Sequence, residues 1–158
     1  MAVDREKLLH LLEGARTFGR SLSGRYCVLD TNIVLDILLF KDSKVQPLLD
    51  AIATDNILPI GHLDTFFEFA DVVTRPMFQL RDSQIDQLLH EWVKLHAVFR
   101  EPLSTDFFCR DKDDNKFFNL SRATGAEYLI SKDKKVLKAR GKAKRFGCQV
   151  VKPEQFKL

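Results

Sequence analysis

The sequence predicts an α/β domain with three layers, α/β/α, in which helices cover both faces of a central, mostly parallel sheet of about five strands. First, the chain of 158 residues has room for one compact domain and little else. Second, short apolar runs alternate with segments of helical periodicity, and parallel strands need helical crossovers that cover both faces of their sheet. Third, 45% apolar and 30% charged residues with only 7 Gly and 5 Pro exclude collagen-like and disordered classes.

The N-terminal segment is expected to lie ahead of this domain. Residues 4–20 repeat apolar side chains at helical spacing, which predicts an amphipathic helix. The polar stretch at 21–25 should break that helix. We therefore expect an N-terminal helix and linker over residues 1–24 and the α/β domain over residues 25–158. The helix could either cap the core of the domain or bind a partner.

Strands and helices alternate along the rest of the chain. Continuous apolar runs such as Tyr26–Leu29 are typical of strands that are buried on both faces of a parallel sheet. The predicted strands are residues 26–29, 56–60, 97–99, 128–130 and one more near the C-terminus. The first predicted helix of the domain begins at residue 33, and the next three span 45–53, 62–75 and 83–95. A further helix is expected to start at Asp114, and a short basic one is expected after residue 133. Ser83 is expected to be an N-cap, and Pro76 supplies a stop signal.

Several classes of protein are excluded by the composition of the chain. The longest apolar run, Ile37–Phe40, is far shorter than the roughly 20 residues that span a bilayer, and the first residues are too polar for a secretory signal, so a cytoplasmic location is expected. The three cysteines are widely spaced and the four histidines lack zinc-binding spacing, so a metal site would consist of oxygen ligands. A Rossmann-type nucleotide binder is disfavoured because no Gly-rich phosphate loop follows a predicted strand.

Four acidic residues are expected to meet at one edge of the sheet. Asp30 directly follows the first strand and Asp133 follows a later one, and ligands of parallel α/β sheets bind at the carboxyl ends of the strands. Asp114 stands at the start of a helix, and Glu68 lies at the border of the apolar stripe of its helix. Each residue also has a structural explanation, as a strand end, a turn residue, a helix cap and part of a solvated face, respectively.

Such a cluster would need a cation. Two carboxylates about 4 Å apart repel each other by about 1 kcal/mol in water and about 4 kcal/mol at an effective dielectric constant of 20. A pocket that offers only oxygen ligands and a high negative charge suits Mg²⁺ or Mn²⁺, the hard cations that help to cleave phosphate esters.

Four segments hold these acids: VLDTN at 28–32, EFADVVTRP at 68–76, RDKDDNKFFNLS at 110–121 and AEYLISKD at 126–133. Taken together, they resemble the PIN domain family, in the branch described as toxin components of toxin–antitoxin pairs. The resemblance covers roughly residues 25–155 and implies a ribonuclease that depends on Mg²⁺ or Mn²⁺. It also implies catalytic, metal-binding and supporting residues: Asp30, Glu68, Asp114 and Asp133 as the acids, with Asn32 and Ser131 near the site.

Two departures from the family pattern affect the site. Ser131 stands where the family commonly has Thr, a change that keeps the hydroxyl. Asp111, Asp113 and Asp114 crowd the third acidic position, so the assignment stays open among them. Asp114 is preferred because it lies seven residues before Ser121, where the family usually has a small residue. Asp111 is expected to support the site.

A basic segment follows the last acid. Residues 132–145 contain eight Lys and Arg with only Asp133 opposing them, although the formal net charge of the chain is only +3. A solvated helix would explain this run, but its position beside a proposed metal ligand favours a rim that binds RNA phosphates. The proposed RNA-binding residues are Lys134, Lys135, Lys138, Arg140 and Lys142. The phenylalanine pairs at 66–67, 107–108 and 117–118 are expected in the core rather than stacked on bases.

The sequence thus predicts a metal-dependent ribonuclease that hydrolyses RNA phosphodiester bonds as the toxin of a toxin–antitoxin pair. The resemblance implies RNA, a cognate antitoxin protein and further copies of the chain as partners, with no membrane. One alternative is a non-cleaving module that binds RNA or a partner, and the four retained acids argue against it. Another is an aspartate-dependent phosphatase, which is disfavoured because Asn32 stands where its second aspartate belongs.

Overall fold

A computed structural model, which describes residues 3–19 and 25–158, confirms the three layers. Six strands in the described residues form one sheet in the order β1-β4-β3-β2-β5-β6, and all neighbouring pairs are parallel. The strands are β1 (Arg16–Thr17), β2 (Tyr26–Leu29), β3 (Leu58–His62), β4 (Ala97–Phe99), β5 (Tyr128–Ile130) and β6 (Gln149–Val151). The sheet therefore has one strand more than predicted.

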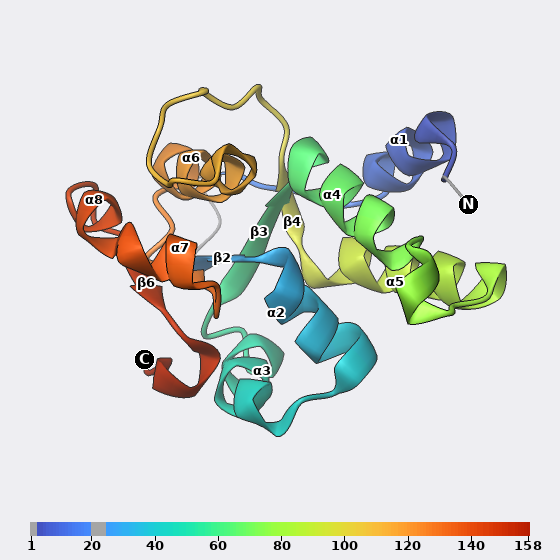
Figure 1. Ribbon diagram of the computed structural model, residues 1–158, viewed down its shortest axis with the longest axis horizontal. Coiled ribbons are helices and arrows are strands. Elements are labelled where there is room, and N and C mark those ends of the chain that lie inside the picture. Colours follow the sequence, from blue (N-terminus) through green and yellow to red (C-terminus); the bar gives the residue numbers. More distant parts are fainter. Residues whose placement is uncertain (1–2, 20–24) are drawn as a thin grey trace.

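Helices cover both faces of this sheet. Figure 1 shows α6, α7 and α8 on one side of the strands and α1, α4 and α5 on the other. The helices are α1 (Arg5–Glu13), α2 (Thr31–Leu35), α3 (Gln46–Ala53), α4 (Leu63–Val73), α5 (Asp82–Leu95), α6 (Asn115–Thr124), α7 (Lys134–Lys138) and α8 (Arg140–Lys144). Successive side chains of β2 enter opposite cores, because Cys27 and Leu29 pack with α1 to α5 and Val28 packs with α6 to α8.

The order of the strands creates a topological switch between β2 and β5. From β2 the chain moves outward through β3 to β4, and it then returns to place β5 on the other side of β2 and β6 beyond it. In parallel α/β sheets, ligand sites form at the carboxyl ends of the strands where the strand order reverses. The residues that follow β2 and β5 therefore occupy the position that the topology favours for a site.

The N-terminal helix is shorter than predicted and caps the core. It ends at Glu13, where Gly14 favours termination, and Arg16–Thr17 then pairs with β4 instead of continuing the helix. Leu8 and Leu12 are buried in the core on the side of α4 and α5. Of the two roles left open for this helix, the structure supports the cap. The polar stretch predicted to break the helix lies outside the described residues, apart from its last residue.

Strand β3 is shifted by two residues from its predicted position. It spans Leu58–His62 instead of 56–60 because Gly61 continues the strand under a helix. An added Cβ at Gly61 would lie 2.4 Å from the ring of Trp92 on α5, so only glycine permits this close approach. Gly61 thus extends the strand beyond its predicted end.

The starts of two helices also differ from the prediction. Helix α5 has Arg81 as its N-cap rather than Ser83, so it begins one residue early. The helix expected from residue 33 begins at Thr31 and changes to a π-helical turn over Asp36–Phe40. Both starts differ from the prediction by no more than two residues, as helix ends commonly do, whereas the π-helical turn was not predicted.

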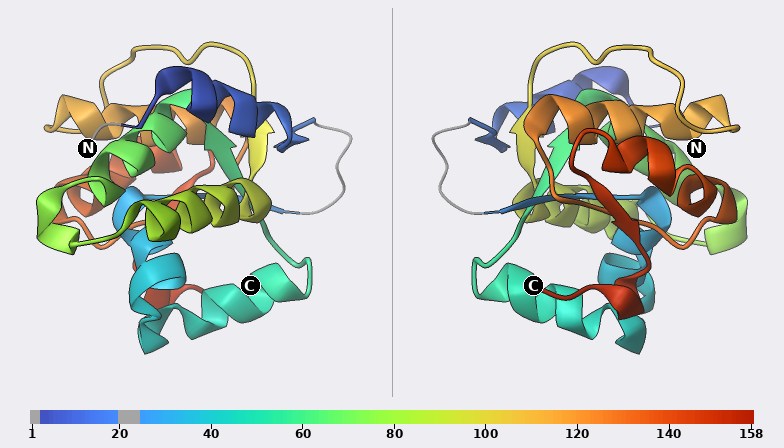
Figure 2. Two further views of the ribbon diagram at one scale, coloured as in Figure 1. Left: turned by 90° about the vertical axis from the view of Figure 1, so that its right-hand side faces the viewer. Right: turned by 90° about the vertical axis from the view of Figure 1, so that its left-hand side faces the viewer.

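The prediction that all six paired phenylalanines lie in the core is wrong for one of them. Phe107 is 68% exposed, whereas Phe117 and Phe118 are buried. Phe108 packs against the rings of Phe118 and Phe146, with centroids 5.6 Å apart in each case. Phe108 thus packs on the protein, whereas the preceding Phe107 faces solvent. Figure 2 shows this loop, residues 100–111, arching over the molecule.

Candidate active site

Asp30 lies at the carboxyl end of β2, in the middle of the sheet. Its N–H donates to the carbonyl of Ile130 at 3.0 Å, and the residue is only 5% exposed. In the described structure its side chain makes no cap hydrogen bond to α2; instead, Oδ2 accepts from Ser131 Oγ at 2.6 Å. Burial raises the pKa of Asp30 to about 6. The hydrogen bond from Ser131 lowers this pKa, and the negative charges of Glu68 and Asp133 raise it further.

Asp114 stands at the start of α6 with a half-buried carboxylate. Its side chain makes no cap hydrogen bond within the described helix. Its Oδ2 atom is buried, and no described residue offers it a hydrogen bond. Burial raises the pKa of Asp114 to about 7, and Asp30 contributes most among several acidic neighbours. A buried carboxylate oxygen without a partner costs free energy, so this atom marks a place for a ligand.

Glu68 on α4 faces the same cluster, but two neighbours engage it. Lys116 Nζ on α6 lies 2.7 Å from Glu68 Oε1, and Thr31 Oγ1 donates to Glu68 Oε2. The Glu68 side chain is 22% exposed, whereas that of Asp71 on the same helix is 74% exposed. The solvated-face explanation therefore applies to Asp71 and not to Glu68.

Asp133 borders the cluster and also caps a helix. Its Oδ1 atom accepts from the N–H of Lys135 at 2.8 Å, as a turn or cap residue does. Its own N–H donates to Ser131 Oγ at 3.1 Å, so Ser131 links the backbone of Asp133 to the carboxylate of Asp30. The charge of Asp133 raises the pKa of both Asp30 and Asp114, which places it near both.

The three aspartates at the third acidic position differ in their surroundings. Asp111 Oδ1 accepts from the N–H of Asp113 at 3.0 Å and caps the turn before α6, and its Oδ2 lies 4.0 Å from Lys135 Nζ. Asp113 is exposed. Asp114 alone of these three has a buried oxygen without a hydrogen-bond partner among the described residues. These surroundings favour Asp114 as the third acid, with Asp111 beside it.

Sequence reasoning missed two polar residues that follow Asp30 in the chain, Thr31 and Asp36. Asn32 is exposed, and the preceding Thr31 contacts Glu68 instead. Asp36 has a side chain that is only 5% exposed, and its Oδ2 lies 2.7 Å from Lys132 Nζ. An acid inside the apolar run after Asp30 was the available signal for Asp36, because a buried charge needs a partner.

The basic segment divides along the crossover from β5 to β6. Lys134 and Lys135 start α7 directly after Asp133 and lie beside the acids. The chain must then return to the amino edge of the sheet to enter β6 in parallel. Arg140 and Lys144 accordingly line a pocket of about 540 Å³ beside β6. All five predicted RNA-binding residues are exposed.

The oxygen ligands of the cluster suit a hard divalent cation, although the four acidic side chains do not converge on one point in this structure. Carboxylate and hydroxyl oxygens suit Mg²⁺ and Mn²⁺ as ligands, and Asp114 Oδ2 has no described hydrogen-bond partner that a metal ion would have to replace. Within residues 3–19 and 25–158, no three acidic, histidine or cysteine side chains converge into a preformed metal site. Glu68 is paired with Lys116, and Asp133 accepts a hydrogen bond from the backbone of α7. Both acids would exchange these partners to join Asp30 and Asp114.

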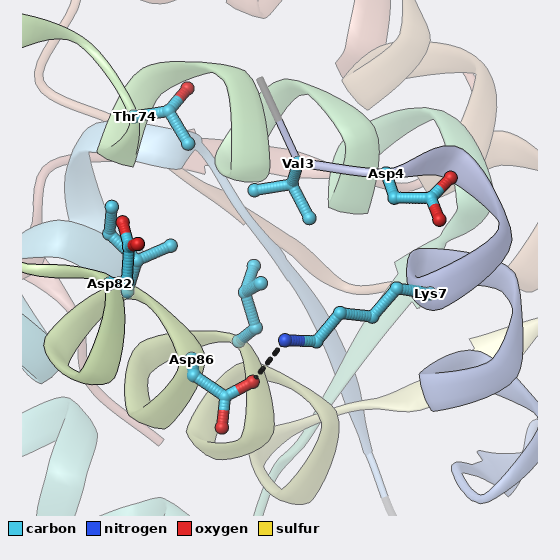
Figure 3. A pocket seen from close by; sticks show the side chains of 8 residues that line it. Val3, Asp4, Lys7, Thr74, Asp82 and Asp86 are labelled. Atoms are coloured by element: carbon cyan, nitrogen blue, oxygen red, sulfur yellow. Dashed lines mark ion pairs between the residues drawn. The ribbon is translucent and has the colours of Figure 1, made fainter. Parts of the chain in front are cut away.

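A second acid-rich region lies in a pocket between α1, α4 and α5 (Figure 3). The pocket has a volume of about 210 Å³, and the described residues that line it include none of the four predicted acids. Lys7 Nζ lies 2.6 Å from Asp86 Oδ1, with both side chains largely exposed, and this contact lowers the pKa of Asp86. The pair ties α1 to α5.

Comparison with known proteins gives the family to which most of the chain is similar. A family model described as PIN domain matches residues 26–135, more than two thirds of the chain. The matched stretch contains β2 to β5 and all four predicted acids, and it leaves α1, β1 and β6 outside. No curated protein matches the chain.

Proposed function

Since this chain belongs to the PIN domain family, whose members are typically nucleases, we propose that it is a metal-dependent ribonuclease that hydrolyses RNA phosphodiester bonds. One observation carries the proposal. The Oδ2 atom of Asp114 is buried with no hydrogen-bond partner among the described residues, in a cluster with the buried Asp30 at the switch point of the sheet. Structural acids are normally paired, whereas Asp114 keeps a buried oxygen without a described partner, which would suit a cation.

The residues of the cluster have distinct roles in this proposal. When bound, Mg²⁺ or Mn²⁺ would polarise a phosphate oxygen and lower the pKa of the attacking water. Asp30 and Asp114 would hold the ion, and both lose their protons close to neutral pH because burial raises their pKa values to about 6 and about 7. The Ser131 hydroxyl keeps the Asp30 carboxylate in place. Glu68 and Asp133 would complete the ligand set and orient the water.

Positive charge beside the acids would hold the substrate. Lys134 and Lys135 are exposed at the start of α7 and would contact phosphates next to the scissile bond. Lys138, Arg140 and Lys142 continue the basic surface along the crossover. The choice of RNA as the substrate class rests on the family motifs.

The family branch also suggests the biological setting. We infer a toxin that a cognate antitoxin protein neutralises and that associates with further copies of itself. The three free and buried cysteines suit a reducing compartment, which supports a cytoplasmic location. Every helix in the described part of the chain is too short or too polar to cross a membrane. The nuclease domain proposed for residues 25–158 would carry the N-terminal segment as part of its fold, with α1 packed on its core and β1 paired with β4.

The experiment is an RNA cleavage assay with a Mn²⁺ titration. The wild-type protein should cut single-stranded RNA only with Mn²⁺ or Mg²⁺, and Asp30→Asn should abolish cutting while leaving the circular dichroism spectrum unchanged. Asp82→Asn, the same chemical change in the pocket of Figure 3, is the matched control and should keep full activity.

Three results would contradict the proposal. An active Asp30→Asn variant would remove the acids from the mechanism. Binding of RNA without metal and without cleavage would select a binding module. Release of phosphate from small phosphate esters, without RNA cleavage, would select a phosphatase.

A further inference from the structure

We propose that Lys116 is a positioning residue that holds Glu68 in the metal-free protein and competes with the divalent cation for this acid. The proposal rests on the metal-dependent function above and adds a means by which the chain regulates loading of the same site. Its basis is the ion pair between Lys116 Nζ and Glu68 Oε1 at 2.7 Å.

The position of this pair is the first argument. Glu68 belongs to α4 in one helical layer and Lys116 to α6 in the other, and α4 and α6 contact each other. Figure 1 shows these two helices on either side of the strands. The pair therefore joins the two layers across the edge of the sheet where Asp30 lies. It stands at the cluster and not on a remote surface.

The burial of the lysine is the second argument. The Lys116 side chain is 22% exposed, compared with 50% for Lys7, 47% for Lys132 and 57% for Lys135 in their own ion pairs. A lysine gives up much of its hydration to reach such a position, so a surrounding negative charge must hold it there. Glu68, whose Oε1 lies 2.7 Å from Lys116 Nζ, supplies that charge.

The use of both Glu68 oxygens is the third argument. Oε1 is paired with Lys116, and Oε2 accepts the hydrogen bond from Thr31 Oγ1. Asp114 Oδ2, by contrast, has no hydrogen-bond partner among the described residues. A cation would therefore displace no hydrogen-bond partner from Asp114 Oδ2, whereas it could take Glu68 only by displacing an existing partner. Because Lys116 and the metal ion are both cations, they also repel each other at close range.

The proposal predicts that removal of the lysine charge tightens metal binding. Lys116→Met keeps the long apolar stem, and we expect it to lower the Kd for Mn²⁺ about fivefold to tenfold in titration calorimetry. The same variant should melt at a lower temperature than the wild type without metal, because the acids lose their internal cation, and should show a larger rise in Tm on addition of Mn²⁺.

Three further variants make the test specific. Lys112→Met removes an exposed lysine close in the chain to the same acids and should leave the Kd within twofold of the wild type. Lys116→Arg keeps the charge and should also bind Mn²⁺ as the wild type does. Lys116→Gln is a second neutral variant with the same expectation as Lys116→Met, for use if that protein does not fold by circular dichroism.

Each outcome has one meaning. Tighter Mn²⁺ binding by the neutral variants, with Lys112→Met and Lys116→Arg unchanged, would support the competition. Wild-type binding of Mn²⁺ with equal or weaker binding by the neutral variants would overturn this inference alone. Absence of Mn²⁺ binding by the wild-type protein would overturn the proposed metal-dependent function and this inference with it.

Discussion

The acids at the carboxyl edge of the sheet and the acids in the pocket between α1, α4 and α5 are the same chemical groups in opposite environments. At the edge, burial raises the pKa of Asp30 to about 6 and that of Asp114 to about 7. In the pocket, a hydrogen-bonded lysine lowers the pKa of Asp86 (Figure 3). The first environment disfavours the charged carboxylate and the second favours it.

This difference teaches which acids to associate with function. Both regions hold several carboxylates and a lysine, so the number of acids does not distinguish them. The difference is that folding buries the acids at the edge of the sheet and destabilises their charged form. A protein tolerates such a cost where a bound ligand compensates for it. The pocket holds a surface ion pair that needs no ligand.

The largest expected effect is on catalysis. Asp114→Asn should lower kcat for single-stranded RNA at least 100-fold at saturating Mn²⁺, because it removes a charge that would hold the ion. Asp86→Asn should stay within twofold of the wild type. Initial rates on a fluorescent RNA measure both. A comparable loss in the two variants would erase the distinction between the regions.

The next effect concerns the pH dependence of stability without metal. A raised carboxyl pKa means that the folded state binds protons more tightly than the unfolded state. The stability from Asp30 is therefore fully present below about pH 4 and is lost as the pH rises through about 6. Its loss amounts to about 3 kcal/mol at most, since one pKa unit corresponds to about 1.4 kcal/mol.

Urea unfolding in EDTA at several pH values between 4 and 8 measures this dependence. The Asp30→Asn variant should have a flatter profile than the wild type and should be more stable than it above pH 7. The contribution of Asp86 to stability depends on pH in the opposite direction. Because its pKa is lowered in the folded state, this contribution is present above about pH 4 and is lost as the pH falls. A wild-type stability that increases from pH 5 to pH 7, with Asp30→Asn unchanged, would contradict the assignment of a buried destabilised acid.

A smaller effect distinguishes the lysines near the two regions. Lys134→Ala combined with Lys135→Ala should weaken RNA binding roughly tenfold and reduce the slope of log K against log salt by about 1.4, as expected for two phosphate contacts to a single strand. Lys7→Ala should change neither quantity. Fluorescence anisotropy at several salt concentrations gives both values, and an unchanged slope in the double variant would remove these lysines from the substrate rim.

The smallest effect is on the stability of the exposed pair. Lys7→Met should cost less than 1 kcal/mol of unfolding free energy, because Lys7 and Asp86 are largely exposed and their attraction is screened. Its Kd for Mn²⁺ should equal that of the wild type. A large loss of stability in urea unfolding would show that the pair is more than a surface contact.

Local patterns predicted most of the fold. Apolar runs located β2, β4 and β5, and helical periodicity located α3 to α5, because those segments bury the faces that their periodicity defines. Strand β1 was missed because Arg16–Thr17 has no apolar pattern and becomes a strand only by pairing with β4. Tertiary pairing decided its conformation.

The candidate site was predictable in part for a similar reason. The position after a strand was enough to bring out Asp30 and Asp133, since parallel strands end at one edge. Lys116 was not predictable, because its partner Glu68 lies 48 positions away and the contact depends on how two helices approach each other. The exposure of Phe107 likewise depends on the path of a loop that has no periodicity.

The most direct test of the central claim is a crystal structure of the protein grown with Mn²⁺, with anomalous diffraction used to locate the ion. We predict an anomalous peak between the carboxylates of Asp30 and Asp114 at the carboxyl ends of β2 and β5. A peak beside Asp82 and Asp86, or no peak within reach of Asp30, would contradict the claim that the buried acids form the metal site.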